Sequence, residues 1–463
     1  MEDITRKVFT PVDPKPPQPH ADPLLDGIQI TDEYRLVERL LRADEPVVFV
    51  TGNAGTGKST LIRYLKSVLE KNIVVVAPTG VAALNAEGVT IHSFFRLPPR
   101  IHEQDDIKRL FNRKVYQKLE LLIIDEVSMV RCDIMDSIDH FLRINRDIDE
   151  PFGGVQMLLI GDLFQLPPVI RRQEGEILEA RGYSSGYFFS SQSLQKSSFV
   201  PVELTRIYRQ EDPEFIALLN NVRVGEELES VTEDLNSLCH GRVGFVPNIT
   251  LTCTNDLADR INFTELRKIS DAEKMYEGVV TGEFRLDQDK LPSPMELRLK
   301  PGAHVMFTKN DENDRWVNGS LGIVRQADGR SITVEMVTDS VGTVYEVKPV
   351  SWASFKYKYN AEEDKIEAEE IGQYRQFPLM LAWAITIHKS QGKTLTNVLI
   401  DFGNGAFAPG QVYVALSRCR STADISLARP IRYTDIKCDP LIKRFYLVIE
   451  EERNRTSGIG TGG

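Results

Sequence analysis

The sequence predicts an α/β fold in which helices cover both faces of a parallel sheet. Four segments begin with an apolar, strand-like run that ends in a turn, at residues 47–71, 73–84, 121–129 and 157–169. Strands that alternate with helices form parallel sheets. The 463 residues are 41% hydrophobic and 27% charged, which is enough for about three domains with sizeable cores. Because ligands bind at the carboxyl ends of parallel strands, we expect the functional site where these turns meet.

The first of these segments contains the pattern of a phosphate-binding loop. Gly52, Gly57, Lys58 and Ser59 fit G-x-x-x-x-G-K-[ST] between a strand-like run and a helical pattern. Glycines let several backbone N–H groups point at phosphates, and the helix adds its positive N-terminal end. Lys58 would reach the β- and γ-phosphates, and Ser59 would offer its hydroxyl to Mg²⁺. An ordinary glycine-rich turn is the alternative, but the context predicts that a nucleoside triphosphate contacts Gly52, Asn53, Ala54, Gly55, Thr56, Gly57, Lys58, Ser59 and Thr60.

Two further strand ends carry side chains suited to ATP hydrolysis. Asp125 and Glu126 follow an apolar run; Asp125 would hold Mg²⁺, and Glu126 would orient or deprotonate the attacking water. Asp162 and Gln165 follow the next run, and Gln165 could sense the γ-phosphate. A solvated acidic strand end and a structural turn are the simpler explanations. Beside a phosphate loop we favour catalytic functions for Asp125, Glu126 and Gln165.

Charge and cysteine content limit the class of protein. The net charge of −11 argues against indiscriminate binding of polyanions, so a nucleic-acid site must be a local basic groove. The sequence has neither an apolar run of about 18 residues nor a signal-peptide pattern. Residues 1–25 contain six prolines and are expected to be a disordered lead-in. The cysteines show no zinc-binding spacing and are typical of reduced thiols in an intracellular protein: Cys132, Cys239, Cys253, Cys419 and Cys438.

Seven segments resemble, in order, the motif series of superfamily 1B helicases. The match is strongest to the Pif-type (petite-integration-frequency) DNA helicases and their RecD-like relatives. The resemblance extends from about residue 47 to residue 419 and implies two RecA-like domains with ATP between them and 5′-to-3′ movement on single-stranded DNA. The segments are VFVTGNAGTGKST, VVVAPTGVAALNAEGVTIHSFF, LLIIDEVSM, PFGGVQMLLIGDLFQLPPV, LTRIYRQ, AWAITIHKSQGKTL and VYVALSRCRS.

The resemblance and the residue patterns together predict the domain organisation. We expect a first RecA-like domain at residues 26–200 and a second at residues 201–296 and 372–440. At residues 297–371, short strands separated by the turn signals DEND, NGS and DGR predict an inserted small β-barrel. Residues 92–119 interrupt the alternation of strands and helices. In the family, an insertion at this place is a pin that splits the duplex; a surface loop is the alternative. Residues 441–463 are expected to form a C-terminal helix and tail.

The resemblance also implies functions for individual residues. Arg209 and Arg418 are candidates for an arginine finger at the γ-phosphate, with a surface salt bridge as the alternative for each, and Gly392 would lie near the nucleotide. Phe94 and Phe95 could stack on a base or belong to the core. His388 could likewise contact DNA or be packed in the core. The implied DNA-binding residues are Thr79, Gly80, His92, Ser93, Phe94, Phe95, Asn255, His388 and Lys389.

Two features depart from the family pattern. The family usually has a glutamine before the first strand that reads adenine, whereas this region has Tyr34, and Gln29 lies just upstream. Adenine selectivity therefore does not follow from the resemblance. Residues 133–150 also lack the basic run that many relatives carry there.

We therefore expect an ATP- and Mg²⁺-dependent, monomeric 5′-to-3′ DNA helicase. Its partners would be single-stranded DNA and duplex or forked DNA, with RNA–DNA hybrids and guanine quadruplexes as further substrates. It would act in replication, repair, recombination or telomere maintenance, in the bacterial cytoplasm or in a eukaryotic nucleus or mitochondrion. The alternatives are a translocase that cannot unwind, which an ineffective pin would give, and an ATP-gated nucleic-acid clamp, which Glu126 disfavours. A double-stranded-RNA or metabolic ATPase would not explain the second-domain arginines or HKSQG.

Overall fold

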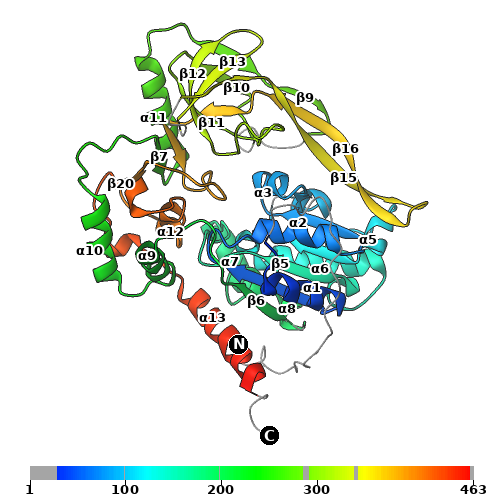
Figure 1. Ribbon diagram of the computed structural model, residues 1–463. Helices are drawn as coiled ribbons and strands as arrows, with labels where there is room; N and C mark the ends of the chain where they lie inside the picture. Colours follow the sequence, from blue (N-terminus) through cyan, green and yellow to red (C-terminus); the bar gives the residue numbers. More distant parts are fainter. Residues whose placement is uncertain (1–28, 99, 198, 285–290, 338–341, 459–463) are drawn as a thin grey trace.

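The computed structural model describes residues 29–458 except 99, 198, 285–290 and 338–341. The expected lead-in at residues 1–25 and the end of the tail at residues 459–463 lie outside this range. Figure 1 shows two groups of strands and helices side by side, a strand-rich third group above them, and one long C-terminal helix below. The α/β fold class is confirmed.

A six-stranded parallel sheet forms the centre of the first domain. Its strand order is β3-β2-β4-β5-β1-β6, and every neighbouring pair is parallel. Its strands are near-continuous apolar runs because helices cover both faces. The strands are β1 (Val47–Gly52), β2 (Ile73–Ala77), β3 (Val89–Thr90), β4 (Leu121–Ile124), β5 (Gln156–Ile160) and β6 (Val200–Leu204).

Helices pack on both faces of this sheet and divide its core into two clusters. Val47 and Phe49 of β1 point into one cluster, and Val48 and Val50 point into the other, as the alternation along a strand requires. The helices are α1 (Asp32–Arg42), α2 (Lys58–Val68), α3 (Gly80–Asn85), α4 (Ile91–Phe94), α5 (Lys114–Lys118), α6 (Cys132–Arg146), α7 (Arg172–Ala180) and α8 (Gln192–Gln195).

The first sheet extends further along the chain than the sequence suggested. The expected boundary after residue 200 is wrong, because β6 pairs with β1 from Val48–Val200 to Gly52–Leu204. The segment reads VPVEL, and its proline lies where β6 forms the edge of the sheet. The first sheet therefore includes residues up to Leu204.

A four-stranded parallel sheet, in the order β18-β7-β19-β20, forms the second domain. Its strands are β7 (Ile249–Thr252), β18 (Ala384–Thr386), β19 (Val398–Asp401) and β20 (Ile425–Leu427). Its helices are α9 (Pro213–Val224), α10 (Leu228–Cys239), α11 (Asn255–Lys268) and α12 (Gln411–Leu416). β7 and β18 are adjacent and parallel, although more than a hundred residues separate them in the sequence. The intervening chain is thus an insertion into this sheet.

The insertion consists of antiparallel sheets and is larger than expected. It begins with β8 and ends with β17, so the bounds of residues 297–371 were too narrow; short, largely exposed strands at its start carry little alternating pattern. The five-stranded sheet β14-β13-β12-β11-β17 has two edges, and a closed barrel is not confirmed. Its strands are β11 (His304–Phe307), β12 (Leu321–Ala327), β13 (Ile332–Met336), β14 (Val344–Val347) and β17 (Leu379–Leu381). The others are β8 (Lys274–Glu277), β9 (Val279–Gly282), β10 (Glu296–Leu299), β15 (Val350–Asn360) and β16 (Lys365–Gln376).

The hairpin of β15 and β16 reaches from the insertion to the first domain (Figure 1). The Tyr357 hydroxyl accepts a hydrogen bond from the Val75 N–H on β2, 3.4 Å away. The Asn72 amide oxygen accepts the Ile366 N–H at 2.7 Å, and Lys118 Nζ lies 2.7 Å from Asp364 Oδ1. The acidic stretch AEEDKIEAEE therefore forms a hairpin tip and the start of β16.

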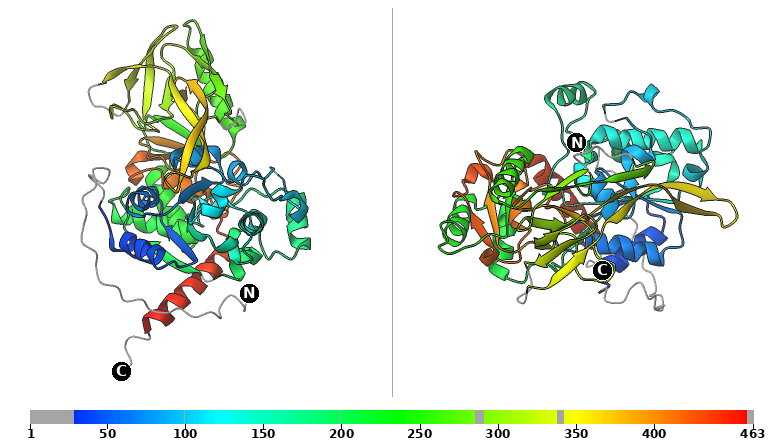
Figure 2. Two further views of the ribbon diagram at one scale, coloured as in Figure 1. Left: turned by 90° about the vertical axis from the view of Figure 1, so that its right-hand side faces the viewer. Right: turned by 90° about the horizontal axis from the view of Figure 1, so that it is seen from above.

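The last helix, α13 (Pro440–Gly458), returns the chain to the first domain. Figure 2 shows it leaving the second domain along the lower side of the first. Its Phe445 ring stacks on Phe189 at 4.3 Å and lies 6.1 Å from Phe49 of β1. The two parallel-sheet domains are therefore joined both by the connection from β6 to α9 and by α13. Within the part of the chain that the structure describes, no helix is long and apolar enough to span a membrane.

Candidate active site

The phosphate-binding loop connects the end of β1 to the start of α2. Gly55 and Gly57 have φ values of +84° and +87°, a region that disfavours residues with a Cβ. The Tyr34 hydroxyl donates to the Gly57 carbonyl at 2.6 Å. Lys58 Nζ donates to the carbonyls of Gly52 and Asn53, at 2.8 and 2.9 Å. Burial lowers the pKa of Lys58, while Asp162 and Glu126 oppose the shift.

Two carboxylates follow β4 at the same edge of the sheet. Asp125 is buried, and its Oδ1 accepts the backbone N–H of Glu126 at 2.9 Å. Glu126 adopts a φ of +51°, an uncommon conformation for a residue with a side chain. Burial raises the pKa of both groups, and the negative charge of Asp125 raises that of Glu126 further. Such a group can accept a proton near neutral pH.

A glutamine of the second domain reaches into this cluster. Gln391 Nε2 donates to Glu126 Oε2 at 3.3 Å and to Gln165 Oε1 at 3.2 Å. These bonds connect the turns after β4 and β5 of the first domain with the turn after β18 of the second. The sequence segment HKSQG suggested a nucleotide or DNA contact, but it gave no particular function for Gln391.

The two candidate arginines also lie between the domains. A Cβ built on Gly55 would meet Arg209 Cβ at 2.6 Å, so Arg209 lies directly against the phosphate-binding loop. Arg209 donates to the Ser417 carbonyl at 3.1 Å and to the Gly392 carbonyl at 3.4 Å. Arg418 is 1% exposed, donates to the Val414 carbonyl at 2.9 Å, and has its pKa lowered to about 9, first by burial and then by Arg209.

Arg418 has no carboxylate within ion-pair distance among the described residues, and neither has Arg209. The surface salt bridge that we considered for each arginine is therefore not what the structure shows. The charge of Arg418 does act on Glu126, whose pKa it lowers in opposition to burial. The Arg418 guanidinium instead bonds to the carbonyls of Val414 and Ser390 and to the Ser417 hydroxyl. Both arginines thus bring positive charge near the site without a carboxylate that neutralises it, which suits a polyanionic ligand.

A buried ion pair next to the loop was missed in the sequence. Asp162 is fully buried, and its Oδ1 lies 3.2 Å from Nη2 of Arg223 on α9. Its Oδ2 accepts hydrogen bonds from Gln165 and from the Tyr413 hydroxyl, both at 3.2 Å. That hydroxyl accepts the Ala54 N–H of the phosphate-binding loop at 3.0 Å. The sequence offered only weak evidence for this pair, because Arg223 is a single arginine near the end of the helical segment PEFIALLNNVRV.

Most of the expected DNA-binding residues lie at the carboxyl ends of parallel strands. Thr79 follows β2 and caps α3, while Gly80 begins that helix. In the second domain, Asn255 follows β7 at the start of α11 and is exposed. His388 and Lys389 follow β18; Lys389 is exposed, and burial lowers the pKa of His388. His92 and Ser93 lie on α4, after β3.

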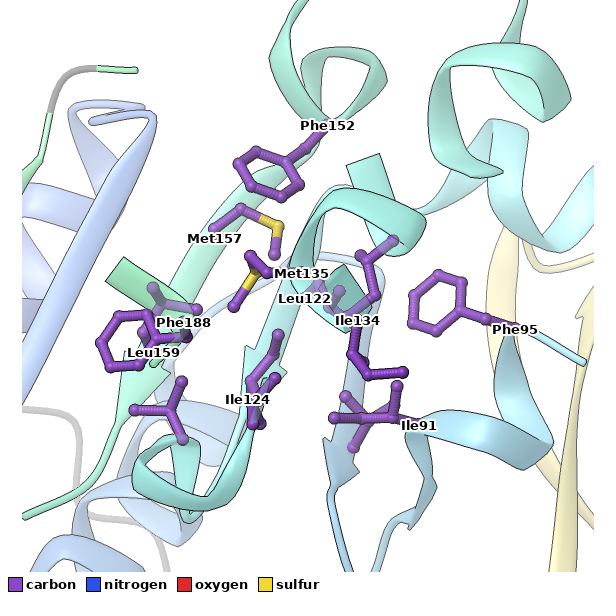
Figure 3. Close-up of a cluster of buried hydrophobic side chains, with 14 of the residues drawn as sticks. Ile91, Phe95, Leu122, Ile124, Ile134, Met135, Phe152, Met157, Leu159 and Phe188 are labelled. Atoms are coloured by element: carbon purple, nitrogen blue, oxygen red, sulfur yellow. The ribbon is translucent and has the colours of Figure 1, made fainter. Parts of the chain in front are cut away.

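Phe94, the last residue of α4, and Phe95, which follows it, are not placed to stack on a base. Phe95 is 1% exposed, packs edge-on against Phe141 of α6 and lies beside Ile91 and Ile134 (Figure 3). Phe94 packs against Tyr116 of α5, whose hydroxyl donates to the Phe94 carbonyl at 2.8 Å. The expectation that either ring binds DNA is wrong, because both rings complete the hydrophobic core.

The oxygen atoms near the loop fit a magnesium ion that is shared with a nucleotide. No group of three or more histidine, cysteine or acidic side chains in the described ranges is placed to hold a metal alone. Mg²⁺ takes hard oxygen ligands, commonly one or two from the protein together with phosphate oxygens and water. The Ser59 hydroxyl at the start of α2 and the Asp125 carboxylate are ligands of this kind.

Comparison with known proteins agrees with the motif series. Residues 30–233 match the family model of the PIF1-like helicases. The human ATP-dependent DNA helicase PIF1 is 33% identical over 92% of this chain, and the match covers 65% of the human protein. The chain thus spans less than two thirds of that relative. ATP-dependent DNA helicase Pif1 of Bdellovibrio bacteriovorus is 34% identical, over 91% of this chain and 93% of its own length.

Solved structures match over a similar length. Bacteroides Pif1 in complex with ADP-AlF4 has a TM-score of 0.81 and is 39% identical, with 93% of this chain and 98% of that chain covered. Bacteroides Pif1 bound to single-stranded DNA has a TM-score of 0.68 at the same identity, with 92% and 98% covered. The resemblance stated from the seven motifs is confirmed: this chain belongs to the PIF1-like helicase family.

Proposed function

We propose that this chain is an ATP-dependent DNA helicase that moves 5′ to 3′ along single-stranded DNA and separates duplex DNA. The main support is the contact of Gln391 from the second domain with Glu126 and Gln165 from the first. This contact supports the proposal because it joins Glu126, which would activate the water, directly to the second domain. Its relatives are named ATP-dependent DNA helicases, which agrees with the proposal.

ATP would bind with its phosphates in the loop between β1 and α2. The backbone N–H groups of the loop, the helix end and Lys58 supply positive charge to the phosphates. Ser59 and Asp125 would hold Mg²⁺, which neutralises phosphate charge when it is bound. Glu126 would orient the attacking water and take its proton, since burial raises its pKa toward neutrality.

The second domain would complete the γ-phosphate site. Arg209 lies against Gly55, and Arg418 lies one turn beyond Val414 with no carboxylate partner among the described residues. An arginine finger of this kind contributes about 10³–10⁵ in rate. Gln165 and Gln391 would bridge the two domains only while the cleft is closed. Loss of the γ-phosphate would remove a ligand that both domains hold, and the cleft would open.

Single-stranded DNA would lie across the carboxyl ends of the strands of both domains. Thr79, Gly80, His92 and Ser93 would contact it from the first domain, and the second would use the residues that follow β7 and β18, Asn255, His388 and Lys389. Alternating grip by the two domains would move the protein along the strand. The segment at residues 92–119 would separate the duplex. Bacteroides Pif1 has been solved with single-stranded DNA, and another solved structure shows two coordinating Pif1 helicases at forked duplex DNA. These relatives support DNA of both kinds as the partner.

We further propose that the chain acts as a monomer inside the cell. A cytoplasmic, nucleoid-associated place in a bacterium, or a nuclear or mitochondrial place in a eukaryote, is consistent with five free cysteines, four of them buried. Replication, repair and recombination intermediates would be the substrates, with RNA–DNA hybrids and guanine quadruplexes as further ones.

The test is strand separation on two duplexes, one with a 5′ single-stranded tail and one with a 3′ tail. We expect ATP-dependent unwinding of the 5′-tailed duplex only, and its loss in Lys58→Ala. Unwinding from the 3′ tail would contradict the proposed direction. Hydrolysis that single strands stimulate, without unwinding, would indicate the translocase, and ATP-dependent DNA binding without hydrolysis would indicate the clamp.

A further inference from the structure

The last helix of the chain contributes a side chain to the surroundings of the phosphate-binding loop. The hydroxyl of Tyr446 on α13 lies 2.5 Å from Oγ1 of Thr51, and either group can be the donor. Thr51 directly precedes Gly52, the first glycine of the loop, and is itself 2% exposed. This contact joins two residues that are 395 positions apart in the chain.

The Tyr446 ring belongs to a stack of planar groups around the buried ion pair. It lies 4.8 Å from the Phe164 ring at an interplanar angle of 17°. The Arg223 guanidinium lies over both rings, 4.4 Å from the centre of Phe164 and 5.6 Å from that of Tyr446. Arg223 pairs in turn with Asp162. We call this group the Asp162 cluster; its members are Thr51, Asp162, Phe164, Arg223, Tyr413 and Tyr446.

The Asp162 cluster joins three parts of the chain. Thr51, Asp162 and Phe164 belong to the first domain, Arg223 and Tyr413 belong to the second, and Tyr446 belongs to α13. Two hydrogen bonds connect the cluster to its surroundings. One comes from Ala54 in the phosphate-binding loop, and the other comes from Gln165, the residue proposed to sense the γ-phosphate. Every member is buried except Tyr446, which is half-buried. A hydrogen-bonded polar network of this kind fixes the relative positions of its members.

From these contacts we infer that Tyr446 is a positioning residue of the ATPase site, and that α13 is part of the apparatus that holds the phosphate-binding loop. The contacts of Tyr446 are with protein groups: it fixes the end of β1 through Thr51 and the turn after β5 through Phe164. The inference rests on the proposed ATP hydrolysis for its effect on turnover. Its effect on the loop is independent of hydrolysis.

The matched pair of variants is Tyr446→Phe and Tyr187→Phe. Tyr446→Phe keeps the stacked ring and removes the hydroxyl that contacts Thr51. Tyr187 of the first domain is buried, and its hydroxyl donates a 2.8 Å bond to Asp439, the residue directly before α13. It does not contact the Asp162 cluster in any described interaction. Both variants therefore lose one hydroxyl that joins the C-terminal part of the chain to the first domain. Only Tyr446→Phe loses a hydroxyl next to the phosphate-binding loop.

The first measurement is hydrogen exchange of the peptide that covers residues 52–57 in nucleotide-free protein. We expect Tyr446→Phe to speed exchange of this peptide about three- to tenfold, the range that one net hydrogen bond gives, and Tyr187→Phe to leave it unchanged. Equal exchange in Tyr446→Phe and the wild type, or equal acceleration in both variants, would overturn the inference.

The second measurement is ATP hydrolysis with saturating single-stranded DNA. We expect Tyr446→Phe to lower kcat about three- to tenfold with KM for ATP changed less than about twofold, and Tyr187→Phe to match the wild type. A wild-type kcat in Tyr446→Phe would refute a positioning function. Absence of hydrolysis in the wild type would refute the proposed function instead, and the exchange measurement would still decide the inference.

Discussion

Removal of the Arg223 side chain should leave a buried negative charge without its partner. Asp162 is fully buried and Arg223 is 9% exposed, so water cannot replace the lost guanidinium. Breaking a buried pair on one side costs about 3–5 kcal/mol in the free energy of unfolding. For a cooperative unit of about 150–250 residues this corresponds to a fall in Tm of roughly 6–20 °C.

The assay is differential scanning calorimetry of Arg223→Ala, Asp162→Asn and the double variant. Asp162→Asn removes the charge but keeps a side chain of similar shape that can bond to Tyr413. The double variant should therefore recover a large part of the Tm that Arg223→Ala loses. Arg172→Ala is the matched control, because its pair with Glu176 is exposed and worth about 0–1 kcal/mol. A loss below about 2 °C in Arg223→Ala, or no recovery in the double variant, would show that the buried pair does not stabilise the fold in this way.

Three further predictions concern the site and the core. Burial, and then the charge of Asp125, raises the pKa of Glu126 from 4.5 to about 7. The contribution of Glu126 to stability is therefore complete below pH 4.5 and is lost as the pH rises through 7. Glu126→Gln should remove this part of the slope of Tm against pH, and an unchanged slope would contradict the raised pKa of Glu126. Phe95→Ala should destabilise the first domain by about 3–5 kcal/mol, measured by thermal unfolding, whereas the fully exposed Phe111→Ala should not; loss of DNA affinity at unchanged stability would restore Phe95 as a base-stacking residue. Arg418→Ala should lower kcat for ATP about 10³–10⁵-fold with little change in ATP affinity, whereas the neighbouring exposed Arg420→Ala should keep kcat; near-normal turnover would remove Arg418 from the site.

Local patterns in the sequence were enough to predict the four longer inner strands of the first parallel sheet, β1, β2, β4 and β5, and the phosphate-binding loop. The loop is one continuous segment, and its glycines have the positive φ values that its function requires. Asp125 and Glu126 directly follow an apolar strand, so their place at the edge of the sheet also follows from the sequence. These predictions needed only neighbours within a few residues.

Features that depend on distant parts of the chain could not be predicted in this way. Arg223 meets Asp162 across 61 positions, and Tyr446 meets Thr51 across 395. No local pattern distinguishes such an arginine or tyrosine from a surface residue. The edge strand β6 and the early start of the insertion were missed for a related reason, since short strands are defined by their pairing partners.

In the proposed mechanism, the contacts between the two parallel-sheet domains form a site of ATP hydrolysis, and Glu126 is the group that activates water. The most direct measurement compares wild type and Glu126→Gln, with ATP binding measured at equilibrium and phosphate release measured in the presence of single-stranded DNA. We expect Glu126→Gln to bind ATP with similar affinity and to release phosphate about 10²–10⁴-fold more slowly. Phosphate release at the wild-type rate would show that Glu126 does not activate the water.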